Sequence, residues 1–240
     1  MTLRILMPCD AIREPLTGVG RMAFTLLRGL SELGHEVIPL DWQDNPLARR
    51  ATGRCAVLPP RLAQLRTPLW HFDLLRRIDT LGIDHDVLLN PTGYPNVLGS
   101  HRCLVMVVHD LHMLQRSSYR RGKRTWFRAF LGRGLHRAAR LVCVSQHTRA
   151  ALLDRYDLDP VRVAVVPNAL APEFLDAADP PTEPAEDGRY LLSVGTLETR
   201  KNVHRLLDAF ARCRATGLDA KLVFAGRLGH GSEMLQARLR

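Results

Sequence analysis

The sequence predicts an α/β protein built on doubly wound, mostly parallel sheets, and three features of the chain support this. Short apolar runs typical of strands alternate with longer segments of helical periodicity along most of the 240 residues. The strand-like runs are almost continuously apolar, as in parallel sheets that are covered on both faces. A glycine-containing turn, Gly18-Val19-Gly20, separates the first strand from the first helix, as at the start of such folds.

The first elements follow this pattern closely. A strand is expected at Leu3–Met7, and the helix after Gly18 has one apolar face formed by positions 19, 22, 23, 26, 27, 30 and 33. Gly34 ends that helix, and a second strand is expected over residues 36–42. The loop is not a GxGxxG fingerprint. Two interpretations therefore stay open, tight packing of helix on strand and close approach of a ligand to the backbone.

Residues 43–85 indicate a loop and then a helix, and we assign no chemistry to them. Strands are expected at Asp86–Asn90 and at Leu104–Val108, and the second of these ends at His109. Ligands of open parallel sheets bind beyond the carboxyl ends of strands, so His109 is predicted to be functional. Asp110 is interpreted as a turn or cap residue.

A strongly basic segment follows. Residues 115–140 contain nine lysines or arginines and no acidic residue, in a chain of formal charge +10. Three interpretations stay open for this basic amphipathic helix, namely packing on the sheet, docking to anionic lipid, and contact with nucleic acid. The third is disfavoured because no nucleic-acid-binding motif accompanies the charge. The apolar face is Trp126, Phe127, Phe130, Leu131, Leu135 and Ala138, with Arg124, Arg128, Arg133, Arg137 and Arg140 largely off it.

The last elements of the first domain are short. A strand at Leu141–Val144 ends at Ser145, which suits the N-cap of a helix running through Leu153. A further strand at Val163–Val166 is closed by Pro167 and Asn168. The composition of residues 171–188 is that of a linker. The predicted domains are therefore residues 1–170 and 189–240.

The second domain begins with an anion-binding pattern. A strand at 190–194 ends in Gly195, and Arg200 and Lys201 stand before a helix at 203–215 that Gly217 ends. Unpaired amides and the positive end of the helix dipole suit a diphosphate there, and an ordinary turn with two solvated cations is the alternative. A strand at 221–225 and a helix capped by Ser232 follow. Two strands and two helices are too few to bury a domain core of the usual size. We therefore expect the second domain to be a fragment, or to be completed by a second chain.

The cysteines and the hydropathy favour a cytoplasmic protein. The five cysteines show neither a CxxC pair nor zinc-ligand spacing, so we interpret them as buried, reduced thiols and expect no metal site. No apolar run approaches the length of a membrane span. The N-terminus shows no signal-peptide pattern.

Five blocks in order give the chain a resemblance to GT-B-fold glycosyltransferases of family 4, close to bacterial mannosyltransferase-like members. The blocks are Gly18–Arg21, His109–Leu111, Val144-Ser145 with Thr148, Val166–Asn168, and Val194–Asn202. The resemblance implies a complete N-terminal Rossmann-like domain on the acceptor side. It also implies the first part of a second Rossmann-like domain on the donor side.

The resemblance also implies roles for individual residues. It places the catalytic His109 beside the donor sugar and gives Arg200 and Lys201 to the donor diphosphate. The remaining implied positions are Gly18 and Gly20 near the donor phosphates or the acceptor, and Gly195, Ser145 and Asn168 lining or supporting the cleft. The family is retaining and needs neither a metal nor a cofactor beside its nucleotide-sugar substrate.

The expected function is therefore retaining transfer of a sugar, with mannose as a candidate, from a nucleotide-diphosphate sugar to an acceptor hydroxyl. The acceptor would be lipid-linked or a saccharide, in polysaccharide or glycolipid synthesis. The family's later acidic motif is absent from the sequence given, which motivates an alternative. That alternative is a non-catalytic, degenerate transferase that binds a partner or, through residues 116–140, the inner face of an anionic membrane. A sugar-nucleotide epimerase of the same fold is a further alternative.

Overall fold

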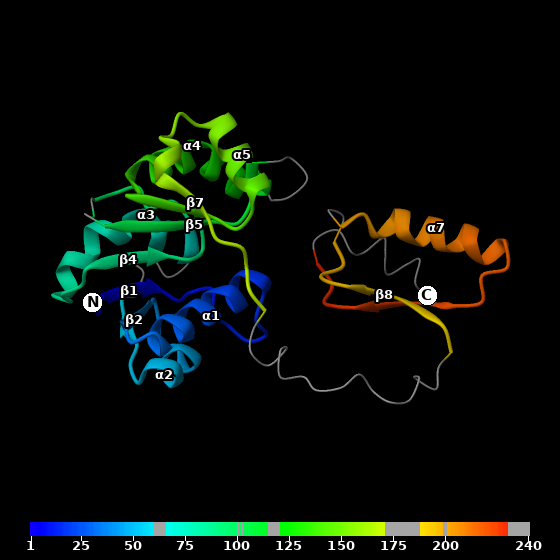
Figure 1. Ribbon diagram of the computed structural model, residues 1–240, viewed down its shortest axis with the longest axis horizontal. Coiled ribbons are helices and arrows are strands. Elements are labelled where there is room, and N and C mark those ends of the chain that lie inside the picture. Colours follow the sequence, from blue (N-terminus) through cyan, green and yellow to red (C-terminus); the bar gives the residue numbers. More distant parts are fainter. Residues whose placement is uncertain are drawn as a thin grey trace. The chain divides into compact units, whose positions relative to one another are not determined.

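The computed structural model describes residues 1–59, 66–99, 101, 103–114, 121–170, 188–198 and 201–229. The chain divides into two compact units, Met1–Phe174 and Leu175–Arg240 (Figure 1). Four predicted features lie wholly or partly outside the described residues: residues 115–120 of the basic segment, the linker up to residue 187, Arg200, and the helix after Ser232.

A parallel sheet forms the centre of the first unit. The strand order is β3-β2-β1-β4-β5-β6-β7, and each of these neighbouring pairs is parallel. The order reverses between β1 and β4, and ligands of open α/β sheets bind beyond the carboxyl ends of strands at such a switch point. The strands are β1 (Arg4–Pro8), β2 (Glu36–Asp41), β3 (Ala56–Val57), β4 (Val87–Asn90), β5 (Leu104–Val108), β6 (Arg140–Cys143) and β7 (Val163–Val165).

Helices cover both faces of this sheet (Figure 1). Side chains of α1 and α2 pack with Met7 and Val37, whereas side chains of α3, α4 and α5 pack with Leu6 and Leu88. Neighbouring residues of one strand thus enter opposite cores, which explains the almost continuous apolar runs. The helices are α1 (Gly18–Glu32), α2 (Pro46–Thr52), α3 (Arg66–Ile78), α4 (Arg121–Arg137) and α5 (Gln146–Arg155), with the 3-10 turns η1 (Asp79–Leu81), η2 (His112–Leu114) and η3 (Pro160–Arg162).

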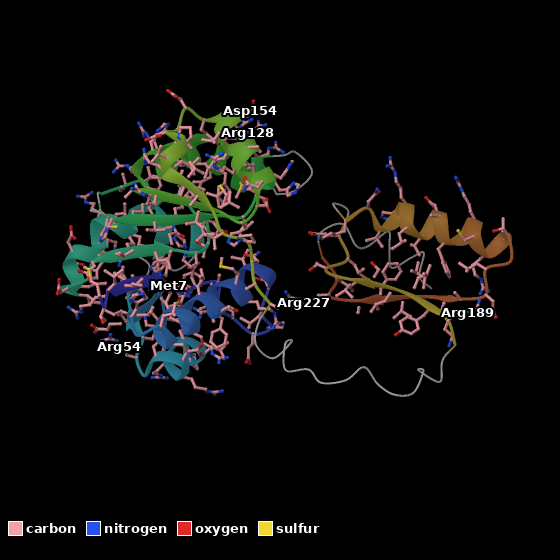
Figure 2. The ribbon with its side chains drawn as sticks, viewed as in Figure 1. Met7, Arg54, Arg128, Asp154, Arg189 and Arg227 are labelled. Atoms are coloured by element: carbon pink, nitrogen blue, oxygen red, sulfur yellow. The ribbon has the colours of Figure 1, made fainter. Side chains whose placement is uncertain are left out.

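The basic helix α4 packs on the sheet as one interpretation expected. Phe127, Leu131 and Leu135 are buried, whereas Arg128 is exposed at the surface of the first unit (Figure 2). The assignment of Arg140 to this helical surface is wrong. The helix ends at Arg137, and Arg140 pairs with Val105 as the first residue of β6, so the parallel ladder takes this residue.

The second unit contains β8 (Tyr190–Val194), α7 (Val203–Ala215) and β9 (Lys221–Ala225), with the bounds that the sequence predicts. The two strands are parallel, and Leu197 and Val203 are buried with Leu207 and Phe224 packed against them. Gly195 has a φ of +140°, a conformation that L side chains rarely adopt. The turn out of β8 therefore requires a glycine.

The cysteines are all free thiols, but they are not all buried. Cys9 and Cys143 are buried, whereas Cys213 is exposed. The expectation of burial is wrong for Cys213 because it lies on a solvent-facing side of α7. Among the described helices, none combines the length and hydropathy that a membrane crossing requires.

Candidate functional site

A pocket of about 390 Å³ opens at the carboxyl ends of β1, β4 and β5, beside the switch point. This volume lies within the range of about 300–1,000 Å³ that is usual for small-molecule sites. The pocket is lined by Asp10, Ala11, Thr17, Val19, Thr92, Gly93, Tyr94, Val108, His109, Asp110, Met113, Phe127 and Leu131. Two of these side chains are acidic, and among the described residues neither lysine nor arginine contributes to the lining.

His109 lies in this pocket directly after β5. Its Nε2 atom is 2.8 Å from the carbonyl oxygen of Pro91, which can only accept a hydrogen bond. The Nε2 atom therefore carries a proton. Among the described residues no partner engages Nδ1 of His109, so this atom is available as an acceptor.

Ser145 supports His109 through Thr148. The Ser145 Oγ atom accepts a hydrogen bond from the Thr148 amide at 3.0 Å, which confirms its predicted role as the N-cap of α5. The Thr148 hydroxyl donates to the carbonyl oxygen of His109 at 3.0 Å and lies 3.0 Å from Ser145 Oγ. Since the Thr148 proton goes to His109, Ser145 donates its own proton to Thr148.

Asp110 shapes the loop that follows His109. Its Oδ1 atom accepts a hydrogen bond from the His112 amide at 2.9 Å. This is the geometry of an Asx turn, so the prediction of a turn residue is confirmed. Asp110 also contributes to the pocket lining.

Gly18 and Gly20 occupy the first turn of α1 and differ in their surroundings. A Cβ atom at Gly20 would lie 2.4 Å from the carbonyl oxygen of Ala11, so close packing of α1 on the loop after β1 requires this glycine. The packing interpretation is therefore confirmed for Gly20. Gly18 is exposed with nothing near its Cβ position, and its neighbours Thr17 and Val19 line the pocket.

The other predicted residues lie elsewhere. Asn168 is exposed on the segment after β7 and does not line the pocket. Gly195 and Lys201 belong to the second unit, where Lys201 is exposed and its amide donates to the carbonyl oxygen of Glu198 at 2.9 Å. The structure thus brings His109 together with Thr17 and Val19 at the start of α1 in one pocket, whereas Ser145 does not line this pocket and contacts His109 only through Thr148.

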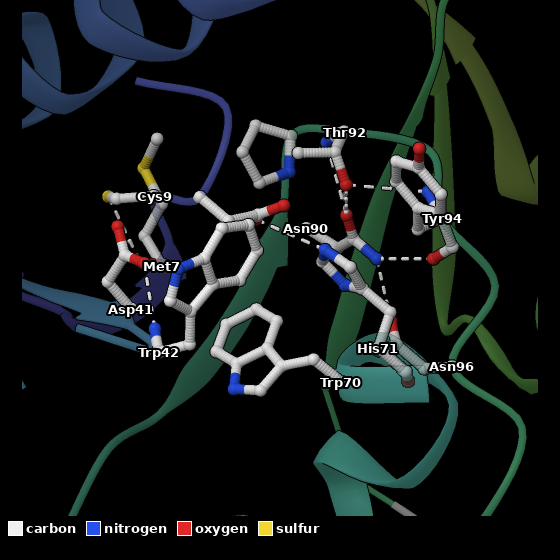
Figure 3. Close-up of polar contacts among 12 residues, drawn as sticks. Met7, Cys9, Asp41, Trp42, Trp70, His71, Asn90, Thr92, Tyr94 and Asn96 are labelled. Carbon is white, nitrogen blue, oxygen red and sulfur yellow. Dashed lines mark hydrogen bonds and ion pairs between the residues drawn. The ribbon is translucent and has the colours of Figure 1, made fainter. Parts of the chain in front are cut away.

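Sequence reasoning missed a buried polar network beside the pocket (Figure 3). Asp10, which follows β1, bonds to His71 of α3, with Oδ1 and Nε2 3.1 Å apart. The Asn96 side chain donates to the His71 carbonyl at 3.0 Å and accepts from Asn90 at 2.7 Å. His109 was predicted to be functional because it follows the carboxyl end of a strand. Asp10 also follows a strand, so the same argument could have identified it. For His71 the sequence offers no comparable signal.

A second network clamps the loop that carries Asp10. The Asn45 side chain donates to the carbonyl oxygens of Cys9 and Ile12, at 3.0 and 3.1 Å, and to Asp41 at 2.8 Å. Asp41 is fully buried and also accepts from Arg13 at 2.6 Å. Burial raises the pKa of Asp41 above its ordinary value, although Asn45 and Arg13 oppose this shift. The loop after β1 is thus tied to the end of β2.

Comparison with known proteins shows that the chain is similar to glycosyltransferases. The family model "Glycosyltransferase Family 4" matches residues 16–174, and the model "Glycosyl transferases group 1" matches residues 176–240. Among solved structures, the crystal structure of a glycosyltransferase from Rickettsia africae ESF-5 is similar, with 14% identity and a TM-score of 0.49. That match covers 94% of this chain and 68% of the other. A search of curated proteins gave no match.

Proposed function

The chain belongs to glycosyltransferase family 4 and is a glycosyltransferase, and we propose that it moves a sugar from a nucleotide-diphosphate sugar to an acceptor hydroxyl with retention of configuration. The observation that carries the proposal is the position of the pocket. It lies at the switch point of the first unit, and all of its lining residues except Asp10 and Ala11 fall within the residues that match the family model. Mannose is a candidate sugar, and a glycolipid or a polysaccharide is the candidate product.

His109 is the proposed catalytic residue beside the donor sugar. Because Nε2 is held by the Pro91 carbonyl, the imidazole offers Nδ1 to the substrate as a hydrogen-bond acceptor. The hydrogen bond from Thr148 fixes the backbone of His109 at the same time. Such a preset acceptor orients a sugar hydroxyl without reorganisation during the reaction.

The donor diphosphate is assigned to the second unit. The pocket of the first unit has acidic lining residues, whereas Lys201 stands exposed before α7 and Arg200 precedes it in the sequence. Asn202, the N-cap residue of α7, makes no hydrogen bond from its side chain to the helix amides. These amides and the two cations suit the negative charge that develops on the leaving diphosphate. The proposal needs no metal ion, since fixed cations supply the charge.

The test is transfer of labelled sugar by the full-length protein from GDP-mannose, UDP-glucose, UDP-galactose and UDP-N-acetylglucosamine to lipid and polysaccharide fractions. We expect transfer from one of these donors. A His109→Ala variant should lower its rate about 100-fold or more. His147→Ala, at an exposed position of α5, is the matched control. Absence of transfer from every donor, or equal rates for the two variants, contradicts the proposal.

Binding of the donor is measured separately. Arg200→Ala and Lys201→Ala should each weaken the binding of UDP or GDP about tenfold, because each removes a charge-assisted hydrogen bond to phosphate. Arg205→Ala, which removes an exposed cation further along α7, should leave the affinity unchanged. Isothermal titration calorimetry distinguishes these outcomes, and an unchanged affinity in the first two variants removes the diphosphate assignment.

A second candidate function is docking of α4 to an anionic membrane surface. The observation that favours it is the exposure of Arg128 and Arg133 on a helix whose other face is packed on the sheet. Each cation near such a surface contributes about 1 kcal/mol to the free energy of membrane binding. In flotation with phosphatidylglycerol vesicles, we expect Arg128→Glu with Arg133→Glu to lose binding. The control is Arg205→Glu with Arg212→Glu on α7. Binding that survives the α4 changes contradicts this role.

A further inference from the structure

Asp10 and His71 form a buried pair in the wall of the pocket. Asp10 is 6% exposed and His71 is fully buried, and the Asp10 Oδ1 atom lies 3.1 Å from the His71 Nε2 atom. The two residues are 61 positions apart in the sequence, on the loop after β1 and on α3. Only the fold brings them together, and Asp10 is one of the residues that line the pocket.

The surroundings decide where the proton of this pair lies. The other ring nitrogen of His71, Nδ1, is buried, and the described part of the chain offers it no hydrogen-bond partner. A proton on Nδ1 would be buried without an acceptor, which is unfavourable. The ring is therefore the neutral tautomer with its proton on Nε2, and this proton is donated to an ionised Asp10.

The imidazole ring is held rigidly in that position. It stacks on Tyr94 with ring centres 5.0 Å apart and an interplanar angle of 9°, and Trp70 meets it edge-on at 4.9 Å. The backbone carbonyl of His71 accepts from Asn96, as Figure 3 shows. A carboxylate oriented by such a ring is a preorganised acceptor for a donor group entering the pocket.

The remaining acceptor capacity of Asp10 selects the kind of ligand. Oδ1 is engaged by His71, and no described residue donates to Oδ2. A second carboxylate, Asp110, lines the same pocket, so an anionic phosphate is disfavoured there. Tyr94, Val108 and Phe127 add apolar surface beside the carboxylates. Hydroxyl donors on a ring with apolar faces match this lining, which is the chemistry of an uncharged sugar.

We propose that Asp10 binds a hydroxyl group of an uncharged saccharide acceptor through Oδ2 and that His71 is the positioning residue that orients this carboxylate. The inference rests on the proposed function, because it assigns the acceptor of that reaction to this pocket. The donor sugar is assigned to His109 in the same pocket and fits less well beside Asp10, because the diphosphate attached directly to its ring would approach two carboxylates there.

The test is saturation-transfer difference NMR of the full chain with the methyl glycosides of α-D-glucose, α-D-mannose, α-D-galactose and β-D-N-acetylglucosamine. We expect at least one glycoside to bind the wild-type protein. Asp10→Ala should weaken that binding about tenfold or more, because a hydrogen bond to a charged group is lost. Asp10→Asn, which keeps the shape, gives the same comparison if Asp10→Ala does not fold. Asp154→Asn, an exposed carboxylate of α5 (Figure 2), is the control.

Two substitutions of His71 separate positioning from packing. His71→Phe keeps the aromatic stack on Tyr94 but removes the hydrogen-bond donor, whereas His71→Gln keeps a donor and removes the stack. We expect binding to fall about tenfold in His71→Phe and to stay within about threefold of wild type in His71→Gln. A purely structural role would reverse this order, because glutamine fills the aromatic site less well. Thermal unfolding checks that both variants are folded.

Three results would overturn the inference. They are absence of binding by every glycoside, unchanged binding in Asp10→Ala and Asp10→Asn, and an equal loss of UDP-glucose or GDP-mannose binding in Asp10→Ala, which would assign Asp10 to the donor. Glycoside binding that depends on Asp10, together with no sugar transfer, would contradict the proposed reaction and leave the binding role of Asp10 in place. The two failures are therefore distinguishable.

Discussion

The Thr148 hydroxyl donates a 3.0 Å hydrogen bond to the carbonyl oxygen of His109 and thereby joins the start of α5 to the end of β5. Thr148 is 5% exposed, so the donor side of this bond is buried, whereas His109 is only partly buried. The position of His109 thus depends on a residue of another element. The residues that support a site side chain can be as important for its geometry as the side chain itself.

Replacement of Thr148 by valine tests this support. The change keeps the shape but removes the donor, so the His109 carbonyl loses its partner, and we expect a loss of about 1–3 kcal/mol in the free energy of unfolding. Sugar transfer should slow as well. Thr148→Ser keeps the hydroxyl and should lose only about 0.8 kcal/mol for the missing methyl group. Urea unfolding measures both changes, and equal losses in the two variants would contradict a role for the hydroxyl.

Asn45 is expected to be among the most sensitive polar residues of the first unit. Its side chain accepts from the Ala48 amide as the N-cap of α2 and donates to Cys9, Ile12 and Asp41. Asn45→Ala removes the cap and leaves buried acceptors unpaired, so we expect a loss of about 3 kcal/mol in the free energy of unfolding. Asn168→Ala, at an exposed position, should change it by less than about 0.5 kcal/mol. A small loss of stability for Asn45→Ala in urea unfolding would contradict a stabilising role for these hydrogen bonds.

The cysteines should differ strongly in their reaction with iodoacetamide. Burial raises the pKa of Cys143 to about 11, although Arg149 lowers it, so at pH 8 only about one thiol in a thousand is ionised. Cys213 is exposed and should be alkylated first. Mass spectrometry of the native protein follows the labelling, and Cys213→Ser should remove the earliest product. Labelling of Cys143 as fast as Cys213 would contradict the prediction and would show that the buried thiol of β6 becomes exposed to solvent.

We expect a loss of stability on acidification because of two histidines, His85 and His101, that precede β4 and β5 at the amino ends of these strands. The Nε2 atoms of His85 and His101 lie 2.6 Å apart, and the rings are stacked. Burial first, and then the charge of His85, lowers the pKa of His101 below its ordinary value of 6.5. The fold therefore favours neutral His101, and this contribution is present above pH 6.5 and is lost as the pH falls through the lowered pKa.

Urea unfolding between pH 7.5 and pH 5, a range about the ordinary histidine pKa, measures this dependence. We expect the free energy of unfolding to fall with pH more steeply for wild type than for His101→Gln. His147→Gln, on the exposed side of α5, should keep the wild-type slope. Equal slopes for all three proteins would show that the His85–His101 pair does not contribute.

Much of the fold follows from local sequence patterns. The bounds of β5, β8, α7 and β9 agree with prediction because each element has a clear periodicity and a turn residue at its end. The error at Arg140 arose where two elements join without glycine or proline. There the helical pattern continues in the sequence, but pairing of Arg140 with Val105 in the parallel ladder decides the structure.

The sequence by itself determined the alternation of strands and helices and His109 as a residue at the end of a buried strand, whereas the glycines expected in a turn before the first helix form its first turn. Only the tertiary structure decided that Asp10 meets His71 and that Thr148 holds His109, because these contacts join segments 61 and 39 residues apart. Periodicity reports which face of an element is apolar. The order of strands in the sheet decides which polar side chains meet at the carboxyl ends of the strands, and that order is a property of the whole fold.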